Sequence, residues 1–510
     1  MEEYQNTERT AFARSAPAVL PYFPVGKREG VYGIFIVIFS ILLANCFFFA
    51  GVNLGFSIAI LGITVTGVLY LYRNGCKGSW YSWALLGLSA LIIPGYARSD
   101  DGFVKFVMSC FLFVAVNTGL CDLAGKNMWD WGSVRSLSDS FRTAFSETFG
   151  KISYTFRGFS IALQTGGAVV KNGSAVLLGA AIAVPVLAIL IPLLMSADAA
   201  FQGVLELLPE FQLDELLVTL IFGGGLACLS YTRCVALRHT HKRENLHVSI
   251  RKGINTLTVN TVLGAVCVVY GVYLVSQLAY FVGGFAGILP GEFTVAEYAR
   301  RGFFEMAWIC LINLSIMILA VSLTEKRGNR APLSVRLLCL FIGVVTLFLV
   351  AAASAKMVLY IGSFGMTRLR VLTMVIMVFL GLTTAVIGIW LFAQKLPYMK
   401  VVLLSAMILG AAVLWTDVDS VVARYNVDGY LTGQLESVDI SYLKWLGSGA
   451  VPHLDRLARQ ASDGDVREKA SEALTTLAYR HDVEDFRSWN YTDAVAEDIL
   501  EGYKIIDPNQ

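Results

Sequence analysis

The chain has 510 residues, of which 56% are hydrophobic and 15% are charged, and its mean hydropathy is +0.63. Soluble domains carry roughly 25% charged residues, so this composition excludes an ordinary soluble protein and indicates a chain that lies largely in lipid. The formal net charge of +2 lacks the basic excess with which proteins neutralise nucleic-acid phosphates, and we expect no nucleic-acid partner.

Residues 1–30 form a polar arm that mixes acidic, basic and proline residues before any apolar run. A secretory signal would instead begin with a short basic stretch and end at a small-residue cleavage site. We therefore expect a cytoplasmic arm and a first apolar segment that stays in the chain as an anchor.

Eleven apolar segments follow, each long enough to cross a bilayer as a helix, because a hydrocarbon core about 30 Å thick needs roughly 20 apolar residues. They lack the alternation of a lipid-spanning barrel strand. The sequence therefore predicts an all-α polytopic transmembrane bundle, with four helices in 31–121 and seven in 173–415. The predicted spans are 31–50, 54–72, 80–97, 103–121, 174–195, 213–232, 256–279, 303–323, 337–359, 371–394 and 399–415.

Lysine and arginine are distributed unevenly between the two ends of these spans. With the N-terminus inside, the inner segments hold 24 of the 40 Lys and Arg residues, the outer loops and span ends hold seven, and the polar tail holds nine. The loop after the fifth span carries Asp198, Glu206 and Glu210 but no base. Because cytoplasmic loops retain positive charge, we predict a cytoplasmic N-terminus.

Residues 122–172 form a long inner loop with a basic, aromatic stripe at roughly helical spacing. Phe141, Phe145 and Phe149 are interleaved with Arg142 and Lys151. Two interpretations fit this pattern. One is an interfacial helix with its rings in the acyl boundary and its bases at anionic headgroups, and the other is a helix packed on the cytoplasmic ends of the spans.

Ionisable residues gather at the predicted outer start of the eighth span. Glu297, Arg301 and Glu305 are four residues apart, which places opposite charges next to each other on one helix face, and Arg300 points to a neighbouring side. A charge inside a span costs about 3 kcal/mol on the lenient insertion scales. Such residues therefore usually face a partner or a water-filled cavity.

More polar residues lie at the same predicted outer level, near the end of the ninth span and just after the eleventh, where Asp417, Asp419 and Arg424 begin the tail. Two interpretations remain open: a polar site that opens outward, or an interfacial ring of snorkelling and paired charges. We define the candidate polar site as nine residues: Asp198, Glu297, Arg300, Arg301, Glu305, Lys356, Tyr360, Arg368 and Arg370.

Residues 416–510 form an acidic tail with 18 acidic and nine basic residues. Apolar residues recur at spacings of three and four around Leu454 and Leu474, as on one face of a helix, and Asp463 suits a helix start. We predict a small domain of two or three short helices, whose core is marginal unless it packs on the membrane part. Eleven spans that start inside place this tail outside the cytoplasm.

The sequence contains no Walker loop, no G-x-S-x-G and no H-E-x-x-H motif. None of the nine cysteines forms a C-x-x-C pair, and His239, His241 and His247 lie in a basic loop without a cysteine at ligand spacing. We expect no catalytic residue, no metal and no cofactor, and an enzyme is the less supported hypothesis.

Six short segments carry a family resemblance: LLMSADAAF (193–201), AEYARRGFFEM (296–306), SAKMVLYIGSFGMTRLR (354–370), ARYNVDGYL (423–431), AVPHL (450–454) and RSWN (487–490). They resemble the bacterial polytopic membrane proteins of the domain of unknown function 4173 family, which is related to family 4153. Where that pattern reads ADPVF, this chain has Ala199 and Ala200 after Asp198. The resemblance implies a bacterial cytoplasmic-membrane protein without an assigned reaction, substrate or cofactor.

Two hypotheses for the function follow. The first is a transporter, or a lipid- or anion-binding membrane scaffold, whose outward-facing charged site binds a polar group. The second is a sensory or regulatory membrane component, in which the acidic tail reads the envelope and the basic inner loops contact a signalling protein. The expected partners are the lipid bilayer and an envelope or cytoplasmic protein.

Overall fold

The regular elements of the described chain are helices, which confirms the predicted all-α class. Nine of the described helices are long and apolar enough to cross a membrane, so the chain is a multi-pass integral membrane protein. The computed structural model describes residues 22–127, 140–165, 213–239, 253–285, 303–325, 330–393, 395–479 and 485–504, with isolated positions at 138, 186, 190, 193 and 194.

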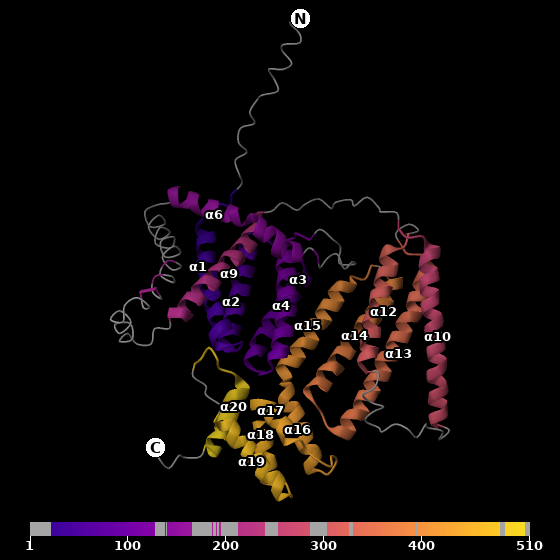
Figure 1. The fold of residues 1–510 in the computed structure, drawn as a ribbon. Helices are drawn as coiled ribbons and strands as arrows, with labels where there is room; N and C mark the ends of the chain where they lie inside the picture. The colour runs from indigo at the N-terminus through magenta and orange to yellow at the C-terminus, as the bar shows by residue number, and fades with distance from the viewer. Residues whose placement is uncertain are drawn as a thin grey trace.

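The N-terminal half of the bundle packs α1 against both α2 and α9, and α3 against α4 (Figure 1). A 3-10 turn, Ile93–Ala97, extends α3 to the end of the predicted span 80–97. The half consists of α1 (Lys27–Asn45), α2 (Leu54–Arg73), α3 (Trp80–Ile92), α4 (Gly102–Leu123) and α9 (Leu213–His239).

The C-terminal half is joined to the first through α15, which packs on α3 and α4. One buried apolar cluster includes Leu85 of α3, Met108 of α4 and Met407 of α15, so the two halves share a core. This half consists of α10 (Thr256–Phe285), α12 (Phe303–Leu323), α13 (Leu333–Phe364), α14 (Arg368–Phe392) and α15 (Tyr398–Thr416).

Most helices are longer than the spans that hydropathy marks. Helix α13 covers 333–364 where the sequence predicted 337–359, and α9 continues from the predicted end at 232 to His239. Hydropathy detects only the part that needs lipid, whereas an established helix extends at little cost into the interface. The predicted span 174–195 lies outside the continuous ranges that the structure describes.

Helix α6 (Thr148–Thr165) lies across one end of the bundle (Figure 1). It packs on α9, where Thr232 Oγ1 donates a hydrogen bond to Thr155 Oγ1 at 3.1 Å. Phe149 and Phe156 on α6 are exposed. One side of this helix therefore packs on the spans, and insertion of its exposed rings into the membrane interface stays a prediction.

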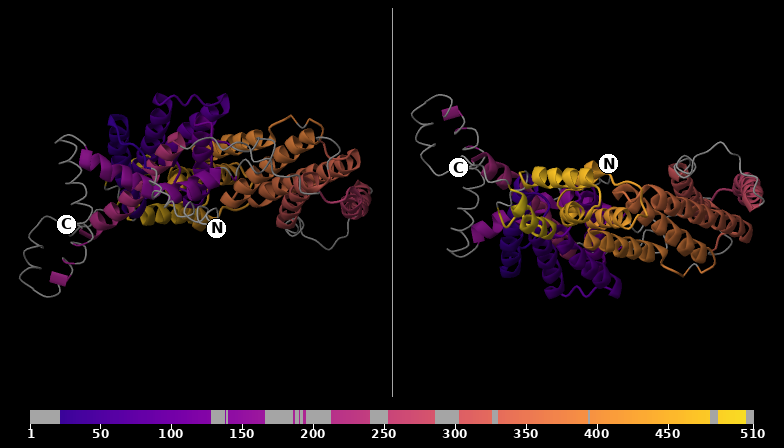
Figure 2. Two further views of the ribbon diagram at one scale, coloured as in Figure 1. Left: turned by 90° about the horizontal axis from the view of Figure 1, so that it is seen from above. Right: turned by 90° about the horizontal axis from the view of Figure 1, so that it is seen from below.

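The tail lies at the opposite end of the bundle from α6, and Figure 2 shows it from below, at the boundary between the two halves. The described tail has five α-helices rather than two or three, because the predicted periodicity around Leu454 and Leu474 covers only α18 and α19 and leaves out α16, α17 and α20. Leu454, Leu457 and Leu474 are buried in its core. The helices are α16 (Val418–Leu431), α17 (Ile440–Trp445), α18 (Val451–Gln460), α19 (Gly464–Ala478) and α20 (Tyr491–Leu500).

The two ends of the bundle differ in chemistry. We call the end that contacts the tail the tail-side face. We call the other end, where α1 begins and α2 and α9 end, the basic face. At the basic face Arg28 Nη1 donates to Arg73 O at 3.2 Å, and Arg238 pairs with the buried Glu29.

Candidate functional site

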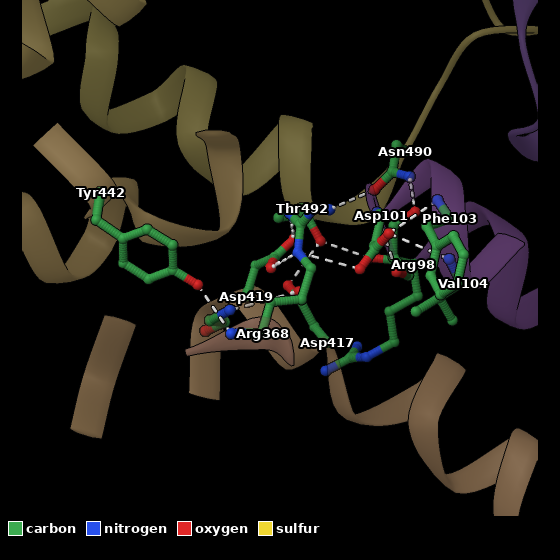
Figure 3. A network of polar contacts seen from close by, with 12 residues as sticks. Arg98, Asp101, Phe103, Val104, Arg368, Asp417, Asp419, Tyr442, Asn490 and Thr492 are labelled. Atoms are coloured by element: carbon green, nitrogen blue, oxygen red, sulfur yellow. Dashed lines mark hydrogen bonds and ion pairs between the residues drawn. The ribbon is translucent and has the colours of Figure 1, made fainter. Parts of the chain in front are cut away.

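Arg368, the first residue of α14, joins the bundle to the tail (Figure 3). Its Nε and Nη2 lie 2.6 and 2.5 Å from the two carboxylate oxygens of Asp419, and its Nε lies 3.1 Å from Oδ2 of Asp101. The guanidinium carbon stacks 4.6 Å from the ring centroid of Trp445. A fork-to-fork contact of this kind fixes orientation as well as charge, so one side chain connects α14, the start of α4 and two tail helices.

The chain leading into α14 explains the position of Arg368. Helix α13 ends at Phe364 and is followed by Gly365, whose φ is 74°, and Thr367 caps the start of α14. Between them, Met366 N donates to Asn426 Oδ1 at 2.7 Å, and Asn426 Nδ2 donates back to Met366 O at 2.8 Å. The turn between α13 and α14 is therefore already fastened to the tail helix α16 where Arg368 begins.

Asp101 is the N-cap of α4 and is 2% exposed. Its Oδ1 accepts hydrogen bonds from Phe103 N at 2.9 Å and Val104 N at 3.1 Å. Capping satisfies two amides at the positive end of the helix dipole and leaves Oδ2 to face Arg368.

Asp417 connects α15 to α16 in a left-handed conformation, with φ 50°. Thr492 Oγ1, at the start of α20, donates to Asp417 Oδ2 at 3.0 Å. Asn490 accepts from Thr492 N at 2.9 Å and donates through Nδ2 to Ser99 O at 2.9 Å. The start of α20 is thus tied both to the end of the last span and to the turn before α4 (Figure 3).

The carboxylates of this cluster are buried near one another, and Arg368 pairs with two of them. Burial raises the pKa of Asp419 to about 6, against the lowering effect of Arg368, and the charges of Asp101 and Asp417 raise it further. Burial also raises the pKa of Asp417, although the hydrogen bond from Thr492 opposes this. Burial therefore favours the protonated forms of Asp419 and Asp417 more than exposure to water would.

Lys105 adds a buried cation one turn inside α4. Its side chain is 5% exposed, and its Nζ donates to Asn53 Oδ1 at 2.7 Å. The same oxygen accepts a hydrogen bond from Asn490 Nδ2 at 3.3 Å. Asn53 thereby connects the start of α2, the first turn of α4 and the tail.

Arg487 makes a second charged contact between the tail and the bundle. Its Nη1 lies 3.2 Å from Glu215 Oε1 of α9 and also donates to Asn45 Oδ1 of α1. Its backbone carbonyl accepts a hydrogen bond from Gly55 N at 3.1 Å, and its side chain pairs with Asp485. The tail is therefore held by α1, α2 and α9 as well as by α14.

The predicted candidate polar site divides between two structural roles. Arg368 faces the tail, whereas Arg370 turns back, so that Nη1 donates to Phe364 O at 3.1 Å. The guanidinium carbon of Arg370 lies 4.1 Å from the ring centroid of Tyr360. Arg370 and Tyr360 therefore close the end of α13 and do not share the partners of Arg368.

Two further predicted residues lie on neighbouring helices. Glu305 is exposed in the first turn of α12, and Lys356 is half-buried on α13. Arg368 instead makes its hydrogen bonds and ion pairs with Asp101, Asp419 and Tyr442. The remaining predicted residues lie outside the described part of the chain: Asp198, Glu297, Arg300 and Arg301.

Sequence reasoning missed Asp101, Asn490 and Thr492. Asp101 stands directly before the predicted span 103–121, and an acid at that position is typical of a helix N-cap. Asn490 is likewise the N-cap of α20. A cap pattern reveals the local role only, and no local pattern pairs residue 101 with residue 368 or residue 490 with residue 99.

A membrane-spanning helical bundle with a helical tail fastened to one end defines a polytopic integral membrane protein. Residues 37–457, most of the chain, match the family described as domain of unknown function (DUF4153), and the chain belongs to that family. The prediction of family 4173 is not confirmed, and the match is to the family named as its relative. No curated protein and no solved structure matches the chain.

Proposed function

We propose that the chain is a regulatory membrane component in which the tail responds to conditions on one side of the membrane and the basic face contacts a signalling protein on the other. The observation that carries this proposal is the course of α9. Near its start, Glu215 pairs with Arg487 of the tail at 3.2 Å, and near its end, Thr232 bonds to Thr155 of α6 at 3.1 Å. One continuous helix connects the two surfaces.

Helix α9 has 27 residues and is therefore about 40 Å long. A helix of this length packed along α1 moves largely as one body, so a displacement of the tail at Glu215 shifts the platform for α6. Thermodynamic coupling between two such surfaces typically changes an equilibrium 5- to 150-fold. The contacts at both ends of α9 are polar and specific. This favours transmission of a displacement from the tail to α6 over simple anchoring of the tail to the bundle.

Charge supports the assignment of sides in this proposal. The tail has twice as many acidic as basic residues, and the predicted inner segments hold most of the Lys and Arg residues of the membrane part. We assign the basic face to the cytoplasm and the tail to the outside, following the retention of positive loops. Phe149 and Phe156, exposed on α6, then offer the cytoplasmic partner an aromatic surface.

The test of coupling uses Arg487→Gln in the full chain reconstituted in lipid nanodiscs. Hydrogen exchange of α6 and of the last two turns of α9 is compared with that of the unchanged protein. We expect at least fivefold faster exchange in α6, because the variant removes the ion pair with Glu215. Arg459→Gln is the matched control, since Arg459 makes an exposed pair with Asp455 within α18.

A change confined to residues 485–504 and their direct contacts would make the tail a structural cap and contradict coupling. The regulatory role needs a second measurement, in which a photo-crosslinking residue replaces Phe156 in cells. We expect one cytoplasmic protein to be captured, with a yield that Arg487→Gln changes and Arg459→Gln does not. Capture of lipid alone, or an unchanged yield, excludes the regulatory function.

The transporter or lipid- and anion-binding scaffold stays a prediction from the sequence. It depends on Arg300 and Glu305 acting together, and Arg300 lies outside the described residues. Arg300→Ala and Glu305→Gln are expected to abolish uptake or binding while leaving the protein abundant in the membrane. Degradation of both variants would make these residues structural.

A further inference from the structure

Arg233 is a buried cation that forms no ion pair with an acidic residue in the described part of the chain. Its side chain lies in α9 and the residue is 7% exposed. Nε donates to Asn117 Oδ1 at 3.0 Å, and Nη2 donates to Asn117 O at 3.2 Å. Glu147, at the end of the π-helix Arg142–Glu147, lies near enough for its charge to act on Arg233, but its carboxylate forms its ion pairs with Arg142 and Lys151.

This arrangement is energetically incomplete. Removing an unpaired guanidinium from water costs several kcal/mol, and a neutral amide offsets only part of that cost. Ionisable residues inside membrane helices accordingly pair with an opposite charge or face a ligand. Since Asn117 satisfies only two of the three guanidinium nitrogens, Arg233 can still donate to an anion.

A cavity of about 370 Å³ opens beside Arg233, between α1, α2, α4 and α9 and the segment that leads into α6. Its volume is in the range of small-molecule and lipid-chain sites. Arg233 and Asn117 supply polar groups to its wall, whereas Ile60, Leu112 and Leu226 are among its apolar lining residues.

The order of these groups along α9 indicates the chemistry of a ligand. Along the axis of α9, Arg233 lies six residues, or about 9 Å, from the end of the helix at the basic face, and Leu226 lies a further 10 Å or so towards the middle of the bundle. The cavity is therefore cationic near one membrane face and apolar towards the centre. A lipid of the leaflet at the basic face has the complementary order, an anionic head followed by an acyl chain.

We propose that this cavity binds an anionic phospholipid of that leaflet, whose phosphate accepts hydrogen bonds from Arg233 and whose acyl chain lies along Leu112 and Leu226. The surrounding bilayer is the source of the ligand. An anionic lipid is favoured over a zwitterionic one, because its net charge neutralises the buried guanidinium. This site is separate from the contacts of the tail, and it does not depend on the regulatory function proposed above.

The test is a lipid titration of the purified full chain, followed by native mass spectrometry. Dioleoyl phosphatidylglycerol is compared with dioleoyl phosphatidylethanolamine, and oleate forms a third arm. We expect phosphatidylglycerol to bind at least tenfold more tightly than phosphatidylethanolamine. Arg233→Gln should weaken phosphatidylglycerol binding about tenfold or more, as for loss of a charge-assisted hydrogen bond, and Arg233→Lys should weaken it less.

Two further variants separate the cavity from general membrane charge. Leu226→Phe fills the apolar part and is expected to weaken binding while keeping the cation. Arg336→Gln is the matched control, because Arg336 lies near the start of α13, with its guanidinium carbon 5.5 Å from the Phe392 ring centroid, and does not line the cavity. It should bind phosphatidylglycerol like the unchanged protein.

Several results overturn the proposal. Equal losses in Arg233→Gln and Arg336→Gln mean that only the overall surface charge attracts the lipid. Unchanged binding in Leu226→Phe means that no acyl chain enters the cavity. Binding of oleate with no binding of phosphatidylglycerol assigns the cavity to a fatty acid and rejects the phospholipid. If Arg233→Gln does not accumulate in the membrane, phosphatidylglycerol binding by Arg233→Lys and Leu226→Phe tests the proposal. Unchanged binding in both variants overturns it.

Discussion

Arg368 of the bundle and Asp419 of the tail form a two-point ion pair, with Nε and Nη2 lying 2.6 and 2.5 Å from the two carboxylate oxygens. The side chains are 19% and 2% exposed, so the pair is largely removed from water. Asp101, from the opposite half of the bundle, faces the same guanidinium. Loss of Arg368 therefore leaves two buried carboxylates without their cation.

We predict that Arg368→Gln lowers the free energy of unfolding by about 3 to 5 kcal/mol, the cost of stranding one member of a buried pair. Thermal unfolding of the detergent-solubilised chain measures the loss, and limited proteolysis should show cleavage within α16 to α20. The control is Arg424→Gln, because Arg424 pairs with Asp428 at 3.5 Å while 72% exposed. Its cost should stay below about 1 kcal/mol, and similar losses in both variants would contradict the role of Arg368.

The raised pKa of Asp419 predicts that the free energy of unfolding depends on pH. Burial raises its pKa to about 6 in the folded protein, above the value near 4 of an unfolded aspartate. The folded state therefore binds the proton of Asp419 more tightly than the unfolded state does. The ionised carboxylate lowers the free energy of unfolding by its full amount above about pH 6. This loss decreases as the pH falls and is absent below about pH 4.

The measurement for this prediction compares Asp419→Asn with the unchanged protein between pH 7.5 and 4. The difference in unfolding free energy should change by up to about 3 kcal/mol in favour of the unchanged protein as the pH falls. Asp101, Asp417 and Arg368, which face Asp419, are present in both proteins. A difference that is constant with pH, or that changes in the opposite direction, shows that Asp419 does not titrate in this range.

The membrane part of the fold could be predicted because each span is specified by local composition. The predicted span 303–323 has the same bounds as α12, since Arg301 and Glu325 flank a mostly apolar run whose only charged residue is Glu305. The tail core followed in the same way from the spacing around Leu454 and Leu474, both buried in the structure. Such signals require only neighbouring residues.

The candidate polar site was predictable only in part, for two physical reasons. The predicted spans 337–359 and 371–394 leave Arg368 and Arg370 in the loop between them, but α14 begins at Arg368, and residues two apart on a helix do not face each other. The second reason is topological, because Arg368 meets Asp101 only after α15 has packed on α3 and α4. No pattern within a single segment encodes that meeting.

Gly365 predicts a backbone effect at the turn between α13 and α14. Its φ is 74°, and a Cβ added there would lie 2.6 Å from Asn426 Oδ1, which holds Met366 N. We expect Gly365→Ala to lower the unfolding free energy by at least about 1 kcal/mol from the backbone conformation alone, because φ 74° with ψ 179° is essentially restricted to glycine, and by more from displacement of Asn426. The melting temperature of the solubilised chain measures this effect.

Gly362, three residues earlier in α13, provides the control for that variant. A Cβ at Gly362 meets nothing within 4 Å, and its φ is that of a helix. Gly362→Ala is expected to be neutral or slightly stabilising, since alanine is the better helix former. If the two variants have the same melting temperature, the turn at Gly365 does not control docking of α16.

The orientation of the chain yields the last prediction, which depends on Lys77 and Ser462. Lys77 is exposed in the turn after α2 at the basic face, and Ser462 is exposed between α18 and α19 in the tail. The inner segments hold 24 of the 40 Lys and Arg residues, and translocation of basic loops is disfavoured. In a background with the nine native cysteines replaced, a membrane-impermeant maleimide should label Ser462→Cys in intact cells and Lys77→Cys only after permeabilisation. Labelling of Lys77→Cys but not of Ser462→Cys in intact cells would show the opposite orientation. Labelling of both would show that the tail and the basic face do not lie on opposite sides of a membrane.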